Sequence, residues 1–172
     1  ETGAYVLLDS GDIFQGTPEG NITKGRIVIS AMNRLGYDAM AIGNHEYDYG
    51  ENNLRSLKVQ ARFPFLAANI FNKRNSKLAD YALPSVILQI GNVRVGVIGI
   101  ATQTTRTSTL PANVEHLNFT DEVAATARQS KALRSAGADI VIALTHCGLS
   151  PSYARQRIDG STYTPTKADL AY

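Results

Sequence analysis

Cysteine is almost absent from this 172-residue sequence, where Cys147 is the single example. One thiol excludes an internal disulfide framework and any zinc site built from several cysteines. No apolar run approaches the roughly 18 residues that a membrane-spanning helix needs. The opening residues also lack the basic-then-apolar pattern of a signal peptide, so they give no information on targeting.

A strong charge of either sign is also missing. The 17 Lys and Arg residues against 15 Asp and Glu residues give a net charge of +2, and the basic residues are scattered along the chain. A nucleic-acid-binding surface would gather them on one face, so we expect no nucleic-acid partner. A hydrophobic share of 44% is ordinary for a globular protein. The length suits one domain, or most of one, with a substantial core.

Short apolar runs alternate with stretches of helical periodicity along most of the chain. The runs predict strands at residues 5–8, 38–42, 65–68 and 139–144. The turn pair Gly91-Asn92 predicts a β-hairpin between residues 86–90 and 93–100. Strands that alternate with helices indicate an α/β domain with a largely parallel sheet.

Apolar spacing predicts three helices, over residues 24–35, 51–61 and about 121–136. Thr120 is the expected N-cap of the third. Gly16, Pro18 and Gly20 predict a loop instead of a helix. Residues 150–172 lose periodicity and are expected to form a loop or an insertion.

Polar side chains follow three of the predicted strands at the points where those strands end. Asp12 follows the first, Asn44, His45 and Asp48 follow the second, and His146 follows the last. Because the carboxyl ends of parallel strands meet at one edge of a sheet, we expect these side chains to lie close together. Oxygen and imidazole ligands without thiolates suit Mn²⁺, Zn²⁺, Mg²⁺ or Fe. The set favours a two-metal hydrolytic site.

Structural roles are alternatives to these functional roles for the same residues. Asp12 could be a turn or cap residue, and His146 could be a core histidine with satisfied hydrogen bonds. Asp48 lies three residues after His45, close enough to fix the tautomer of the imidazole and hold it protonated. Four neighbouring residues are expected to be structural: Asp9 and Glu46 as hydrogen-bonding groups, Cys147 as a small buried residue and His116 as an exposed loop residue.

Three motifs carry a resemblance to a known family. They are Leu8-Asp-Ser-Gly-Asp-Ile-Phe-Gln-Gly-Thr17, Ala41-Ile-Gly-Asn-His-Glu-Tyr-Asp48 and Ala143-Leu-Thr-His-Cys-Gly148. In this order they resemble the calcineurin-like metallophosphoesterases, and within them the N-terminal catalytic domain of the 5′-nucleotidase family, over residues 5 to about 150. The resemblance implies a metallophosphatase-type β-sandwich flanked by helices (α/β/β/α), incomplete at both ends, with residues 1–172 as a partial domain.

The resemblance also implies roles for the polar residues. Asp12 matches the aspartate that bridges two divalent ions (Mn, Zn, Mg or Fe), while Asn44 and His146 match ligands of one of them. Asn44 and His45 match the residues beside the substrate phosphate. His45 matches the transition-state histidine and Asp48 its orienting carboxylate. The implied reaction is in-line attack of a metal-activated water on a phosphate ester, above all that of a nucleoside 5′-monophosphate.

Two motifs of the family do not occur in the sequence. Asp-x-His is expected before the first strand, and Gly-His-x-His is expected after His146. This chain therefore contains three candidate ligands for one ion and only Asp12 for the other. The resemblance further implies a C-terminal specificity domain that these residues do not include. We expect the isolated chain to be a fragment of the enzyme with little activity.

Several alternatives stay open at this point. Within the family they are a 2′,3′-cyclic-nucleotide phosphodiesterase with 3′-nucleotidase activity and a nucleotide-diphosphate hydrolase. Outside it they are a non-catalytic binding domain and an inactive fragment. The resemblance implies a periplasmic, cell-surface or secreted location. Asn21-Ile-Thr23 and Asn118-Phe-Thr120 fit the glycosylation sequon, which matters only in a eukaryotic secretory pathway.

Overall fold

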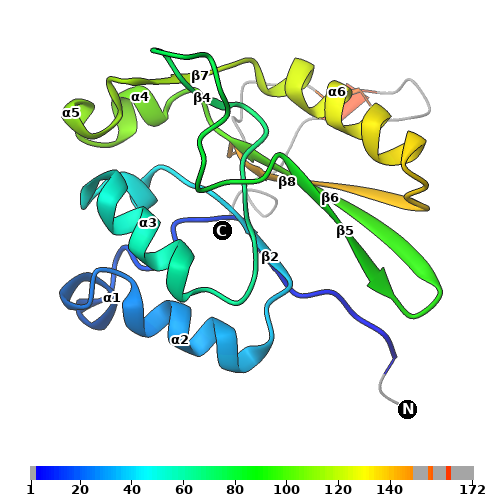
Figure 1. Ribbon diagram of the computed structural model, residues 1–172, viewed down its shortest axis with the longest axis horizontal. Coiled ribbons are helices and arrows are strands. Elements are labelled where there is room, and N and C mark those ends of the chain that lie inside the picture. Colours follow the sequence, from blue (N-terminus) through cyan, green and yellow to red (C-terminus); the bar gives the residue numbers. More distant parts are fainter. Residues whose placement is uncertain (1–2, 149–154, 157–161, 164–172) are drawn as a thin grey trace.

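Two three-stranded sheets form the centre of the molecule (Figure 1), and the computed structural model describes residues 3–148, 155–156 and 162–163. In the first sheet, β1 (Leu8–Asp9), β2 (Ala39–Ala41) and β3 (Phe65–Leu66) run parallel in that order. In the second, β6 (Val93–Ala101) lies between β5 (Ser85–Ile90) and β8 (Ile140–His146). β6 pairs antiparallel with β5 and parallel with β8.

Helices cover both outer faces of this pair of sheets. The helices are α1 (Pro18–Ile22), α2 (Arg26–Leu35), α3 (Gly50–Gln60), α4 (Thr105–Ser108), α5 (Pro111–Val114) and α6 (Glu122–Ser135), with a 3₁₀ turn η1 at His45–Tyr47. Figure 1 shows α2 and α3 on the side of β2, and α6 on the side of β6 and β8. Two short antiparallel pairs complete the described elements: β4 (Ile70–Asn72) with β7 (Leu117–Phe119), and β9 (Arg155–Gln156) with β10 (Thr162–Tyr163).

The buried residues show the layers directly. Met40 of β2 belongs to the apolar cluster beneath α2 and α3, whereas its neighbours Ala39 and Ala41 belong to a cluster shared with β6 and β8. Val97 of β6 belongs to that shared cluster, and the next residue, Ile98, packs in the cluster beneath α6. Because successive strand residues point to opposite faces, each sheet contacts the other sheet on one face and helices on the opposite face. The predicted helix-flanked β-sandwich is confirmed.

The two sheets come closest at Gly99. A Cβ at this position would lie 2.3 Å from the backbone of Leu66, so no larger residue fits without moving β3 or β6. The backbone N–H of Ala68 also donates to the carbonyl of Gly99 at 2.7 Å. This contact ties the segment after β3 to β6 and fixes the first sheet relative to the second.

Most of the sequence predictions for elements hold. α2 ends at Leu35 and is capped by Gly36, which adopts φ of 75°. The hairpin of β5 and β6 turns at Gly91. The predicted loop around Pro18 is wrong, because Pro18 occupies the first turn of α1 and the Thr17 hydroxyl accepts from the N–H of Gly20 at 3.1 Å.

Two element boundaries also differ from their predictions. The N-cap of α6 is Asp121 and not Thr120, since the Asp121 carboxylate accepts from the N–H of Ala124 at 2.6 Å. β8 extends to His146, because its ladder with β6 continues to the pair Ala101 and His146.

The prediction of a loop or insertion over residues 150–172 falls outside the described residues, apart from β9 and β10. Among the helices that the structure describes, none combines the length and apolarity that crossing a bilayer requires.

Candidate metal centre

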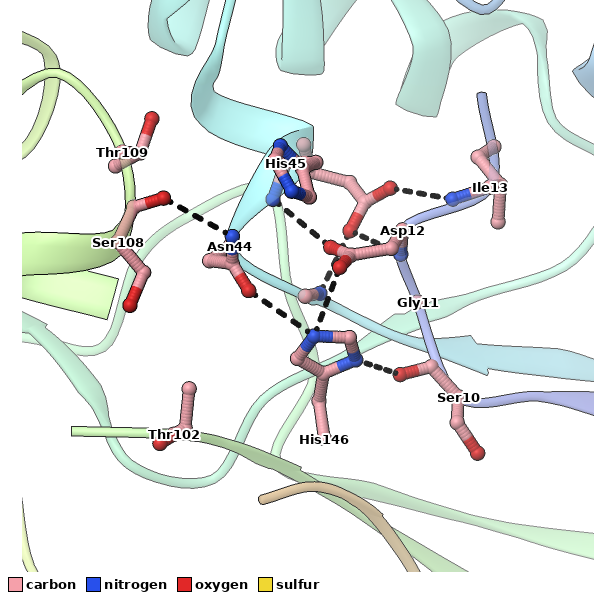
Figure 2. Close-up of polar contacts among 12 residues, drawn as sticks. Ser10, Gly11, Asp12, Ile13, Asn44, His45, Thr102, Ser108, Thr109 and His146 are labelled. Carbon is pink, nitrogen blue, oxygen red and sulfur yellow. Dashed lines mark hydrogen bonds and ion pairs between the residues drawn. The ribbon is translucent and has the colours of Figure 1, made fainter. Parts of the chain in front are cut away.

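Three polar side chains from separate strands meet at one edge of the sandwich (Figure 2). Asp12 lies in the loop after β1, Asn44 follows β2, and His146 is the last residue of β8. Nε2 of His146 lies 3.1 Å from Oδ2 of Asp12 and 3.2 Å from Oδ1 of Asn44. The structure therefore brings together the three residues predicted as ligands of one ion.

The arrangement of these atoms fits a divalent ion. Nδ1 of His146 lies 2.8 Å from the carbonyl of Ser10, so that nitrogen donates its proton and Nε2 is the nitrogen available to a metal. Ligands that bind one ion at about 2.1 Å lie about 3 Å apart when they subtend a right angle at it. Among the described residues, no group of three or more His, Cys, Asp and Glu side chains is placed to hold an ion. The set at this edge instead combines Asp12 and His146 with the amide of Asn44.

Without a metal, Asp12 and His146 form an ion pair. Burial raises the pKa of Asp12, but hydrogen bonds from His146 and from the N–H of His45 outweigh burial and leave this pKa below its usual value. The Asp12 carboxylate raises the pKa of His146 despite partial burial. A metal ion at this position would replace the proton that the two side chains share.

The buried carboxylate of Glu46 holds the two ligand loops together. Its Oε2 accepts from the N–H of Asp12 at 2.9 Å and of Gly43 at 2.7 Å, and its Oε1 accepts from the N–H of Ile13 at 3.0 Å. Glu46 is fully buried. Burial raises its pKa to about 7, while the three N–H donors favour the charged form. The prediction of structural hydrogen bonds for Glu46 is confirmed.

Backbone crowding reinforces this arrangement. Asp12 is held at φ of 62°, in the left-handed region that aspartate adopts more readily than most residues. A Cβ on Gly43 would lie 2.3 Å from Oδ1 of Asp12, and one on Gly11 would lie 2.4 Å from the nitrogen of Gly43. The two loops therefore touch through backbone atoms, which leaves the Asp12 side chain little freedom.

His45 and Asp48 form a second pair beside the ligand set. Nδ1 of His45 lies 2.7 Å from Oδ2 of Asp48 within the η1 turn. The two side chains are 31% and 26% exposed, so solvent reaches the pair. Because Asp48 engages Nδ1, the Nε2 atom of His45 is the ring nitrogen left for a substrate.

Two site residues were not predicted from the sequence. The carbonyl of Ser108 accepts from Nδ2 of Asn44 at 3.2 Å, which orients the amide with its oxygen toward His146 (Figure 2). The hydroxyl of Thr109 donates to Oδ1 of Asp48 at 3.1 Å. The partners in these two contacts are 64 and 61 residues apart in the sequence, and no local pattern near residues 108–109 predicts the contacts.

Three nearby structural expectations have mixed outcomes. Asp9 accepts from the N–H of Gly11 at 2.8 Å, as expected. Cys147 is exposed, so the expectation of a buried thiol is wrong. His116 lies in the loop before β7, but it is only partly exposed and its Nε2 lies 3.1 Å from Oε2 of Glu51.

Comparison with known proteins agrees with the motifs. Residues 1–170 match the calcineurin-like phosphoesterase family. The chain belongs to this family. Hydrolases of the 5′-nucleotidase type are similar to this calcineurin-like phosphoesterase chain over most of its length.

Two curated relatives and one solved structure show the extent of the similarity. A snake venom 5′-nucleotidase from Gloydius brevicauda is 42% identical over 146 residues, or 83% of this chain and 24% of the relative. The human 5′-nucleotidase is 38% identical, over 83% of this chain and 25% of the relative. A 5′-nucleotidase precursor from Thermus thermophilus is 33% identical with a TM-score of 0.76, over 86% of this chain and 29% of that one. The chain thus spans about a quarter of these curated relatives.

Proposed function

We propose that this chain is the N-terminal part of a metal-dependent phosphoesterase that hydrolyses nucleoside 5′-monophosphates. The observation that carries the proposal is the convergence of Asp12, Asn44 and His146 on one point, with the pair His45 and Asp48 alongside. Relatives whose names specify 5′-nucleotidase activity support the choice of substrate.

In this proposal, three residues bind the ion and two others orient them. Asp12, Asn44 and His146 would hold a divalent ion. A bound ion supplies Lewis acidity and a nucleophilic water at neutral pH. Ser10 keeps Nε2 of His146 directed at that point through its bond to Nδ1. Ser108 does the same for the Asn44 amide oxygen.

His45 acts on the phosphate group as a proton-bearing imidazole. Oδ2 of Asp48 lies 2.7 Å from Nδ1 and orients the ring. Nε2–H can then donate to a phosphoryl oxygen as negative charge grows on it, or protonate the leaving oxygen. An interaction that strengthens as charge develops lowers the barrier more than it tightens substrate binding.

The nucleoside of the substrate is recognised, in this proposal, by a specificity domain outside these residues, since the relatives are about four times longer than the matched segment. We further place the parent protein outside the cytoplasm, in the periplasm, at the cell surface or secreted, as the venom origin of several relatives suggests. Fractionation of the source cells tests this location, and recovery of the protein with cytosolic markers contradicts it.

Phosphate release from AMP tests the proposed activity. The parent polypeptide is assayed with Mn²⁺ and with EDTA, as wild type and as His45→Ala. We expect metal-dependent turnover that falls by about 10²-fold or more in the variant. Parallel assays with a 2′,3′-cyclic nucleotide and a nucleotide diphosphate decide between substrates. Turnover that survives EDTA, or an unchanged rate in His45→Ala, contradicts the proposal.

A further inference from the structure

The carboxylate of Asp48 has a partner on each of its oxygens. Oδ2 lies 2.7 Å from Nδ1 of His45, and Oδ1 accepts from the Thr109 hydroxyl at 3.1 Å. An ionised carboxylate can only accept, so Thr109 is the donor. Thr109 belongs to the segment between α4 and α5, which follows β6 of the second sheet, whereas Asp48 and His45 follow β2 of the first.

The segment that carries Thr109 is anchored on both sides of it. On one side, the Ser108 carbonyl accepts from Nδ2 of Asn44 at 3.2 Å. On the other, Nδ2 of Asn113 donates to the carbonyl of Tyr47 at 2.8 Å and to that of Asp48 at 3.3 Å. Figure 2 shows Ser108 and Thr109 beside Asn44 and His45. The Thr109 hydroxyl is thus fixed relative to the turn that carries His45.

We propose that Thr109 is a positioning residue that sets the angle of the His45 imidazole through Asp48. A carboxylate bonded through Oδ2 alone can turn about its Cβ–Cγ bond and carry the imidazole with it. The bond from Thr109 to Oδ1 holds the carboxylate plane, so that His45 keeps one orientation. The inference rests on the proposed role of His45. It means that Thr109, which follows the second sheet, aligns His45, which follows the first.

Two substitutions of Thr109 distinguish the effect of its hydroxyl group from the effect of its packing. Thr109→Val keeps the shape of the side chain but removes the hydroxyl, and Thr109→Ser keeps the hydroxyl. In the Mn²⁺-loaded parent polypeptide, we expect Thr109→Val to lower kcat for AMP about tenfold with KM within about twofold, and Thr109→Ser to restore kcat. Thr107 lies two residues earlier, in α4, where it is exposed and its hydroxyl donates to the Thr104 carbonyl at 3.0 Å. Thr107→Val should therefore leave kcat unchanged.

A double-mutant cycle tests whether Thr109 acts through His45. In a His45→Ala background, Thr109→Val should cause no further loss of kcat, because the group that it positions is gone. An equal further loss in that background would show a general structural role and overturn the inference. A Thr109→Val enzyme with wild-type kcat would overturn it as well.

A spectroscopic measurement distinguishes failure of this inference from failure of the proposed function. In the 172-residue chain, we expect the Nδ1–H proton of His45 to give an NMR signal shifted downfield by its bond to Asp48. We expect Thr109→Val to shift that signal and speed its exchange with water, and Thr109→Ser to restore both. An unchanged signal in Thr109→Val overturns the positioning role whether or not the parent polypeptide hydrolyses AMP.

Discussion

The carboxylate of Glu46 accepts a hydrogen bond from the backbone N–H of Asp12 at 2.9 Å, across 34 residues of sequence. The same carboxylate accepts from Gly43 and Ile13. One buried side chain therefore satisfies three N–H groups from the two loops that carry Asp12 and Asn44. It holds the Asp12 backbone in the left-handed conformation that directs its carboxylate at His146.

Replacement of Glu46 by Gln should destabilise the protein. The amide NH₂ group cannot accept, so at least one of the three buried N–H groups loses its partner. We expect the free energy of unfolding in urea to fall by about 3 kcal/mol. Glu19→Gln, at an exposed position in α1, should change it by less than about 0.5 kcal/mol. Equal stabilities of Glu46→Gln and wild type would show that Glu46 does not brace the loops.

Gly43→Ala should weaken metal binding. The added methyl group would lie 2.3 Å from Oδ1 of Asp12, so the carboxylate has to move. The same methyl group would lie 2.8 Å from the backbone nitrogen of Asp12 and 2.9 Å from Oε2 of Glu46, so the Asp12 loop has to shift as well. We expect Mn²⁺ affinity, measured by calorimetric titration, to fall about tenfold or more. Gly3→Ala, where nothing lies within 4 Å, is the matched control, and equal affinities of the two variants would refute the expectation.

The ion pair of Asp12 and His146 makes metal-free stability depend on pH. The folded pKa of His146 is raised above 6.5, so its contribution is complete below that value and is lost as pH rises through the folded pKa. The folded pKa of Asp12 is lowered below 3.8, so its contribution is present above that value and is lost as pH falls through the folded pKa. In EDTA, the wild type should therefore lose stability as the pH rises from 6.5 through the folded pKa of His146.

His146→Gln isolates this effect, because it removes the titrating group. Its urea unfolding free energy should change less over the same pH range than that of the wild type. Saturating Mn²⁺ should remove the difference in slope, since the ion replaces the shared proton. Parallel pH profiles of the wild type and His146→Gln in EDTA would contradict the pairing.

The sequence predicted those parts of the fold that depend on local patterns. The helical spacing of Ile27, Val28, Ala31, Met32 and Leu35 and the stop at Gly36 located α2, although the residues that this helix buries are Ile29 and Met32. Gly91-Asn92 located the hairpin. The same local reasoning failed at Pro18, where glycine and proline resembled a loop. There the Thr17 cap outweighs the helix-breaking residues, because proline in the first turn lacks only an N–H that would have no partner.

The candidate site could be predicted only for residues that lie in motifs at strand ends. Asp12 and Asn44 share an edge because β1 and β2 are parallel neighbours. His146 ends β8 of the second sheet and joins them because the two sheets pack face to face. Ser108 and Thr109 reach the site because of how the two sheets pack, which depends on close contacts such as Gly99 against Leu66. No periodicity encodes such a contact, so these two residues needed the structure.

Binding of Mn²⁺ to the 172-residue chain tests the central claim most directly. Titration calorimetry compares wild type with His146→Ala and His45→Ala. The account predicts one bound ion in the wild type, affinity lower by about tenfold or more in His146→Ala, and affinity within about threefold of wild type in His45→Ala. Mn²⁺ binding that is as tight in His146→Ala as in the wild type would show that Asp12, Asn44 and His146 do not form the metal centre.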